Sequence, residues 1–299
     1  MPEPTASSTP TAPVVARHWL AFALVTTLSW GVWGALIEIP EKAGFPATLG
    51  YSVWALTMIP CALAALALGG FRLERDRRSV IYGATVGLLG AGGQIVLFEA
   101  LRSGPAYIVF PVVSLYPTVT ILLSVLLLRE RAPLRHWTGI ALSLPAIGLL
   151  SYVTPDSGPV TGFAWLALAL LVFLAWGIQA YFMKTANGIM TAESIFFYMM
   201  ATALLLVPVA VAMTDFSRPV NWGFKGPGLA ALIHVLNSIG ALTLVYALRY
   251  GKAIIVVPMT ALAPVITIAL SLALYGRAPL PAQSIGLVLA VIAIYLMAE

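Results

Sequence analysis

Apolar residues run through this chain in long blocks, each with the roughly 20 residues that an α-helix needs to cross the hydrocarbon core of a bilayer. Membrane barrel strands need only about ten alternating residues, and that pattern is absent here. The blocks therefore predict ten membrane-spanning helices. We place them near residues 18–38, 47–69, 79–101, 105–128, 134–153, 161–184, 192–213, 227–248, 253–275 and 281–298.

Composition supports an all-α integral membrane protein. The chain is 61% hydrophobic and 9% charged, whereas soluble domains are about half apolar and a quarter charged. The net charge of +5 does not indicate nucleic acid binding, because Lys and Arg lie between the apolar blocks. Membrane lipids are the expected surroundings.

The ends and the single cysteine add little chemistry. Residues 1–17 are rich in Pro, Ser, Thr and Ala and are expected to form a disordered tail. They hold no apolar core of a signal peptide, so we expect the first span to be retained as a signal anchor. Cys61 lies inside a predicted span without a second cysteine, which excludes a disulfide or thiolate metal site within the chain.

The sequence repeats itself. Residues 100–106, ALRSGPA, recur as 247–253, ALRYGKA, at a shift of 147. The same shift brings Pro111 onto Pro258 and Pro117 onto Pro264. The first spans match as well: Trp19 falls on Trp165 and Trp30 on Trp176, at a shift of 146. We divide the chain into two five-helix units, 18–153 and 154–299, and the odd number of spans predicts an inverted repeat of the kind that transporters use.

Loop charges predict the orientation. With the N-terminus inside, internal segments carry 11 Lys and Arg residues against 5 in external loops, which favours N-in and C-in.

Ten spans in two units, with the P-x5-P spacing at Pro111 and Pro117 and a basic turn after it, resemble the drug/metabolite transporter superfamily and, within it, the EamA-type carriers. The resemblance covers about residues 18–298. It implies a central cavity lined by spans one, three, four, six, eight and nine, and exchange of small metabolites by rocking of the two halves. A narrower likeness is to bacterial exporters of aromatic and other amino acids of the YddG type, which implies the bacterial inner membrane.

One departure from that family pattern concerns the Glu-Arg pair at the end of the fourth span. Here the pair is Glu130-Arg131, but the second copy has Gly276-Arg277 and lacks the carboxylate. The two copies are therefore not expected to perform the same gating role.

Polar groups within spans are costly in lipid, so each is a candidate for a water-filled site. His234, Asn237 and Ser238 share one face of the eighth span by their i, i+3, i+4 spacing. Hydrogen bonding between helices is the alternative explanation. In the third span the glycines at 83, 87 and 90 suit close helix packing, and Gln94, just past them, is a cavity candidate.

Trp30 and Trp176 stand near the middle of spans one and six. Tryptophan usually lies in the interfacial belt, where we expect Trp19 and Trp165. Inward-facing indoles at 30 and 176 could stack on a ligand or hold a cation; lipid-facing packing is the alternative. One turn further, Trp33 is matched by Gln179. The cavity candidates are thus Trp30, Gln94, Trp176, Gln179, His234, Asn237 and Ser238.

Glu99 lies in the apolar third span and is a candidate for proton coupling, but an ion pair with Arg102 is the stronger interpretation. Pro111, Pro117, Pro258 and Pro264 interrupt spans four and nine, which predicts kinks that could serve as hinges.

Missing motifs narrow the function. The chain has no G-x4-G-K-[ST] loop for ATP, no H-E-x-x-H and no Cys/His cluster, so we expect no enzyme activity, cofactor or metal. The leading hypothesis is a secondary carrier with alternating access that exports small amphipathic metabolites such as amino acids, as a monomer or weak dimer. The alternatives are a carrier of organic or quaternary ammonium cations, with Glu99 as counter-charge, and a non-transporting membrane enzyme or scaffold.

Overall fold

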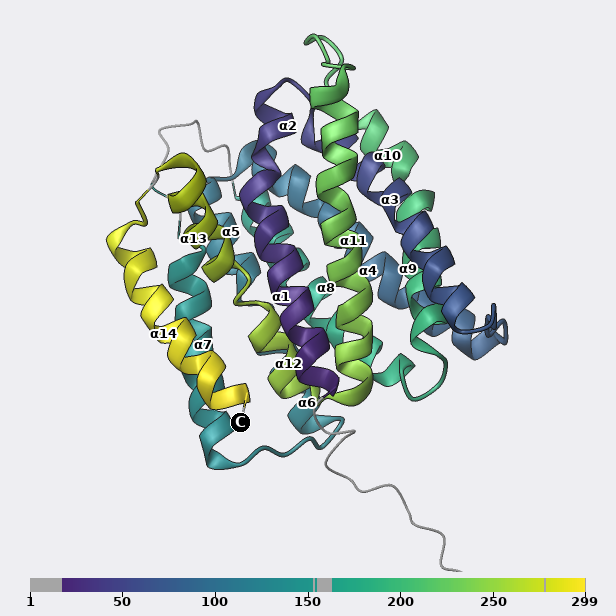
Figure 1. Cartoon of the computed structure of the whole chain (residues 1–299), viewed down its shortest axis with the longest axis vertical. Helices are drawn as coiled ribbons and strands as arrows, with labels where there is room; N and C mark the ends of the chain where they lie inside the picture. Colours follow the sequence, from purple (N-terminus) through teal and green to yellow (C-terminus); the bar gives the residue numbers. More distant parts are fainter. Residues whose placement is uncertain (1–17, 153, 155–162, 277, 299) are drawn as a thin grey trace, which may run out of the picture.

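A computed structural model describes residues 18–152, 154, 163–276 and 278–298, and every regular element within them is a helix (Figure 1). The expected tail, residues 1–17, lies outside the described residues. The ten predicted spans correspond to α1 (His18–Leu36), α3 (Ala47–Leu68), α4 (Arg77–Ser103), α5 with α6 (Ala106–Ser114, Pro117–Leu126), α7 (Leu134–Leu150), α8 (Ala164–Ala186), α9 with α10 (Ala192–Leu205, Val207–Ala212), α11 (Leu229–Tyr250), α12 with α13 (Ala253–Thr260, Pro264–Tyr275) and α14 (Pro281–Ala298).

Nine helical stretches in the described part of the chain are long and apolar enough to cross a membrane. The fifth predicted span, α7, is shorter, with 17 residues. Two short elements were not predicted: α2 (Glu38–Lys42) extends α1, and η2 (Phe224–Gly228), a π-helical turn, precedes α11.

Proline breaks the fourth and ninth spans at equivalent points. α5 ends at Ser114 and α6 begins at Pro117; α12 ends at Thr260 and α13 begins at Pro264. A proline inside a helix removes one backbone hydrogen bond and clashes with the carbonyl four residues earlier, so the chain restarts there with proline in the first turn. Each broken span therefore consists of two half-helices.

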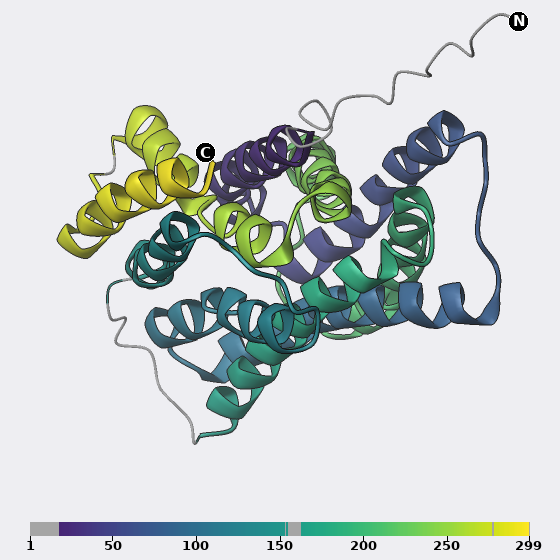
Figure 2. The ribbon, with the colours of Figure 1, turned by 90° about the horizontal axis from the view of Figure 1, so that it is seen from below.

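The two units are interleaved rather than separate. α1 of the first unit packs along α11 of the second, and α8 of the second packs along α4 of the first. The last helices of the units, α7 and α14, pack lengthwise against each other, as Figures 1 and 2 show. We call the face at which α1 begins, and at which α6 and α11 end, the N-terminal face; the other is the opposite face.

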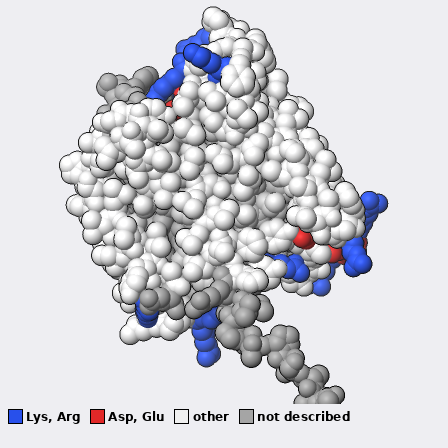
Figure 3. Space-filling model, viewed as in Figure 1, with Lys and Arg blue, Asp and Glu red and all other residues white. Residues whose placement is uncertain are grey.

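The surface suits a bilayer. Large apolar side chains point outward along the helices, including Leu28 at 51%, Leu56 at 55% and Val288 at 62% exposure. In Figure 3 the Lys and Arg side chains gather toward the two ends of the visible face, and the surface between them is uncharged. The molecule therefore has the apolar belt and charged ends of a membrane-spanning bundle.

Candidate functional site

The indole of Trp30 crosses from one unit to the other. Its Nε1 donates a hydrogen bond to the carbonyl oxygen of Asn237 on α11, at 3.3 Å. A methyl group at Gly240, one turn further along α11, would come within 2.5 Å of the Trp30 ring. The absence of a side chain at Gly240 thus leaves the space that the Trp30 ring occupies against α11.

Trp176 makes the corresponding contact from the second unit. Its Nε1 donates to the carbonyl oxygen of Gly90 on α4 at 3.2 Å, and a methyl group at Gly93 would come within 2.5 Å of its ring. Positions 90 and 93 match 237 and 240 at the shift of 147, so the contact is made twice, once in each direction. Both rings are half-buried between helices.

Two threonines repeat the pattern on the broken spans. Thr120 of α6 donates to the carbonyl oxygen of Gly177 on α8, and Thr267 of α13 donates to that of Gly31 on α1, each at 2.9 Å. Buried hydroxyls in lipid need such partners. These bonds attach one half-helix of each broken span to the first helix of the other unit.

Three primary amides stand free near these contacts. In the described part of the chain, the side chains of Gln94 on α4, Gln179 on α8 and Asn237 on α11 are half-buried and make no hydrogen bond. Gln179 lies against Gly90, where a methyl group would come within 2.1 Å of its amide nitrogen. Free amides are costly in an apolar interior unless water or a ligand reaches them.

His234 holds a further free donor. Its Nδ1 accepts a hydrogen bond from Trp33 Nε1 at 3.2 Å, so the neutral ring carries its proton on Nε2. That Nε2 is buried without a partner in the described structure and lies 3.4 Å from where a methyl group at Gly50 would stand. The side chain is 6% exposed. His234 thus fills the junction of α1, α3 and α11.

Ser238 has a different setting from its neighbours. It is fully buried and shares a 3.0 Å hydrogen bond with Thr57 of α3. The structure therefore brings Ser238 to the α3 interface, while the nearby amide of Asn237 remains free. Ser238 therefore makes a hydrogen bond between helices, as the alternative interpretation of this polar face expects.

Glu99 forms an ion pair with Arg102 at 3.1 Å. Their side chains are 47% and 64% exposed, so water screens the pair and its contribution to stability is small. Glu99 is therefore engaged at the surface, close to the end of α4 on the opposite face.

Two further aromatic residues pack beside these contacts. Tyr116, between α5 and α6, packs edge-on against Trp176 with ring centres 6.1 Å apart, a contact that the sequence pattern does not reveal. Trp165, for which the interfacial belt is expected, is the second residue of α8, is 6% exposed and packs against Gly104, where a methyl group would come within 2.7 Å. The tight turn after α4 creates that pocket for the indole.

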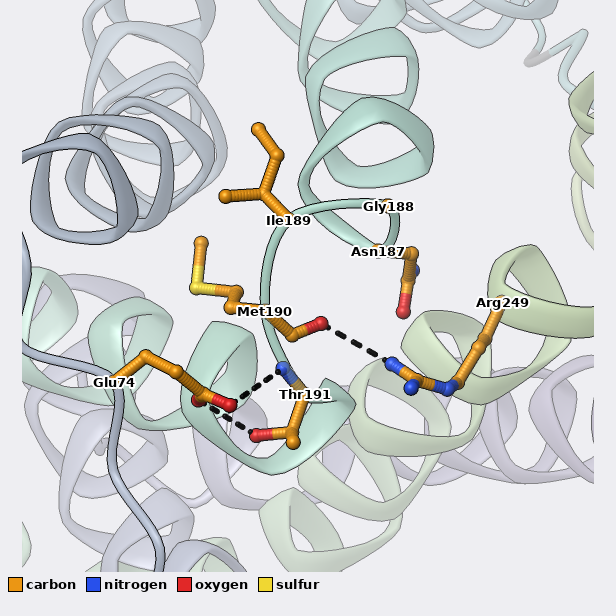
Figure 4. A pocket seen from close by; sticks show the side chains of 7 residues that line it. All are labelled: Glu74, Asn187, Gly188, Ile189, Met190, Thr191 and Arg249. Carbon is orange, nitrogen blue, oxygen red and sulfur yellow. Dashed lines mark hydrogen bonds between the residues drawn. The ribbon is translucent and has the colours of Figure 1, made fainter.

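A shallow pocket of about 250 Å³ opens on the N-terminal face (Figure 4). Glu74, from the loop before α4, accepts a 2.9 Å hydrogen bond from the Thr191 hydroxyl, and Arg249 donates to the carbonyl oxygen of Met190 at 3.1 Å. Desolvation raises the pKa of Glu74, but hydrogen bonds from Ser194 and Thr191 outweigh it and hold the pKa below the ordinary value of 4.5. Glu74 thus joins the turn between α8 and α9 to the first unit, and Arg249 joins the same turn to α11.

Within the described ranges, no group of three or more His, Cys, Asp or Glu side chains is placed to hold a metal ion.

Comparisons with known proteins agree with the arrangement. A family model described as the EamA-like transporter family matches residues 17–152 and again 163–298. An uncharacterized protein of Methanocaldococcus jannaschii, MJ1333.1, is 31% identical over 130 residues, which are 44% of this chain and 93% of that protein. That relative is therefore about as long as one repeat. A solved crystal structure is similar at a TM-score of 0.75 and 20% identity, over 92% of this chain and 97% of the other, and supports the fold alone.

Proposed function

Because the chain belongs to the EamA-like transporter family and is a membrane transporter of small molecules, we propose that it is a secondary carrier that exports small amphipathic metabolites, with amino acids as its substrate class. We propose further that it works by alternating access in a bacterial inner membrane, with the N-terminal face in the cytoplasm.

The free polar groups carry the substrate proposal. Gln94, Gln179 and Asn237 come from three helices of both units, and their amides have no hydrogen bond within the described residues. Amides can donate to a carboxylate and accept from an ammonium group. His234 adds an imidazole N–H donor. This set suits a zwitterion better than a multivalent anion, which needs Arg or Lys.

The indoles support an apolar side chain on the substrate. Trp30 and Trp176 keep their N–H groups occupied by backbone carbonyls, so a ligand would contact the parts of the rings that the neighbouring helices leave uncovered. Aromatic faces pack well on aromatic or aliphatic groups. A quaternary ammonium ligand would also stack there, but Glu99, its expected counter-charge, is paired with Arg102 at the surface.

The closing test is transport by purified protein in liposomes. Labelled aromatic and aliphatic amino acids should exchange across the membrane, and the triple variant Gln94→Ala/Gln179→Ala/Asn237→Ala should lower the rate at least about tenfold by removing the proposed ligands. Thr85→Ala is the control, because the half-buried Thr85 hydroxyl bonds within its own helix to the carbonyl oxygen of Ile81. Exchange of no amino acid, with uptake of a quaternary amine instead, would replace the substrate class.

A further inference from the structure

The turn between α11 and α12 is held by a carboxylate from the other unit. The two oxygens of Glu130, just after α6, accept hydrogen bonds from the backbone N–H groups of Ala253 and Ile254, at 3.1 and 3.0 Å. These are the first two residues of α12, and the first N–H groups of a helix have no partner within it. Lys252 at the N-cap supplies no side-chain bond. Glu130 therefore caps α12 and meets the positive end of its dipole.

A lysine holds the other side of the same turn. Lys184 of α8 donates to the carbonyl oxygens of Leu248 and Gly251, at 2.8 and 2.6 Å. These carbonyls end α11, at the negative end of its dipole. An acid at the start of α12 and a base at the end of α11 thus fix the turn by complementary charge.

Among the described residues, the positions matched to these two groups supply neither an acid nor a base to the equivalent turn on the opposite face, between α4 and α5. The residue that matches Glu130 is Gly276, which has no side chain and a φ of +63°. The residue that matches Lys184 is Glu38, of the opposite charge, which pairs with Lys42 in α2. The acid and the base that hold the turn are therefore found together at the N-terminal face, and the matched described positions have neither.

Helix packing shows the same one-sidedness. All eight residues of α12 are buried, whereas none of α13 is. α12 packs against α1, α6, α7, α8, α11 and α14; its repeat counterpart α5 packs chiefly against α4, α7 and α8. In particular α6 packs on α12, while the matched pair α13 and α5 makes little contact. The half-helices of the broken spans meet at the N-terminal face and separate toward the opposite face.

Other contacts between the units occur on both faces. The difference between the two faces is therefore specific to Glu130, Lys184 and the packing of α12. Glu74 binds Thr191 on the N-terminal face. At the matched position on the opposite face, Asn221 donates to the carbonyl oxygen of Ala43 at 2.9 Å and its backbone N–H to that of Gly44 at 3.0 Å. These paired contacts, with those of Trp30 and Trp176, form a frame common to both faces.

We propose that Glu130 and Lys184 form a latch that keeps the carrier closed at the N-terminal face, and that opening this face requires Glu130 to release the start of α12. The latch rests on the proposed alternating access. With the latch formed, the resting carrier is open to the opposite face. The latch thus explains how two nearly symmetric units can favour closure at one face over the other.

Distances measured without substrate test the latch. In a Cys61→Ala background, one pair of spin labels at Leu127 and Tyr250, both exposed, reports the N-terminal face. A second pair at Leu274 and Phe110, also exposed, reports α13 and α5 toward the opposite face. Glu130→Ala should raise the share of molecules with the long N-terminal distance roughly tenfold, equivalent to about 1.4 kcal/mol, and should shorten the second distance.

Lys184→Met should act in the same direction. Glu99→Ala is the matched control, since that carboxylate pairs within its own helix, and it should change neither distance. Partial unfolding would lengthen both distances, so lengthening at both faces, or no change at either, overturns the latch. The distances do not depend on the cargo: a wild type that moves no amino acid would end the substrate proposal and leave the latch intact.

Discussion

Trp30 of the first unit donates its indole hydrogen bond to the backbone of Asn237 in the second, at 3.3 Å. The bond from Trp176 to Gly90 returns the same contact in the other direction at 3.2 Å. Each unit thus supplies the aromatic side chain and receives one on a glycine-containing helix. Each of these contacts therefore needs both units.

Glycine under each indole should therefore be sensitive to substitution. Gly93→Ala and Gly240→Ala place a methyl group 2.5 Å from a tryptophan ring, and overpacking of this kind costs about 1–3 kcal/mol. Gly92→Ala is the matched control on the same helix, because nothing lies within 4 Å of the added methyl group; helix propensity should stabilise it by up to about 1 kcal/mol. Thermal unfolding in detergent compares the three. If all three variants melted at the same temperature, the close packing of the indoles on Gly93 and Gly240 would be contradicted.

Much of the architecture follows from sequence for identifiable reasons. Apolar block length predicts the spans, and the shift of 146–147 residues predicts two inverted units, because five crossings reverse the direction of entry. What sequence leaves open is the rotation of each helix about its axis. Ser238 and Asn237 are neighbours in sequence, yet one bonds to Thr57 and the other is free. The contacts of Lys184 could not be predicted for the same reason, since they depend on carbonyls that a different helix leaves unpaired.

Acid should weaken the contact between the units at the N-terminal face through Glu74. Its pKa in the folded protein lies below the ordinary 4.5, so its stabilising effect is complete above about pH 4.5 and is lost as pH falls through the folded value. The melting temperature of the wild type should fall more steeply below pH 4.5 than that of Glu74→Gln, which has no charge to lose. Parallel pH profiles of the two proteins would show that this carboxylate does not contribute.

His234 and Ser238, one turn apart, should separate transport from stability. Ser238→Ala removes a buried hydrogen bond to Thr57 and should cost about 0.5–1.5 kcal/mol of stability, with little change in transport per folded molecule. His234→Ala removes the free Nε2 donor and the partner of Trp33, and should raise KM at least several-fold. Initial rates normalised to folded protein decide between them. A larger transport defect in Ser238→Ala than in His234→Ala would reverse their assigned roles.

The second proline of each broken span should set the rate of rocking. Pro117 and Pro264 begin α6 and α13, and in the turns before them Tyr116 and Ala263 donate to carbonyls three residues earlier instead of four. Alanine at either position can donate the missing hydrogen bond and favours a continuous helix. A continuous helix resists the bending that alternating access requires at this point. Pro117→Ala and Pro264→Ala should therefore slow exchange about tenfold and leave substrate affinity within roughly twofold.

Pro145 provides the control for this hinge. It lies inside α7, which packs lengthwise on α14 and is not broken at the proline. Pro145→Ala should leave the exchange rate unchanged, since α7 has no break to lose. Rates from counterflow and affinities from thermal shift with the same amino acid separate motion from binding. If Pro117→Ala weakened binding and left the maximal rate intact, the break would shape the site and would not act as a hinge.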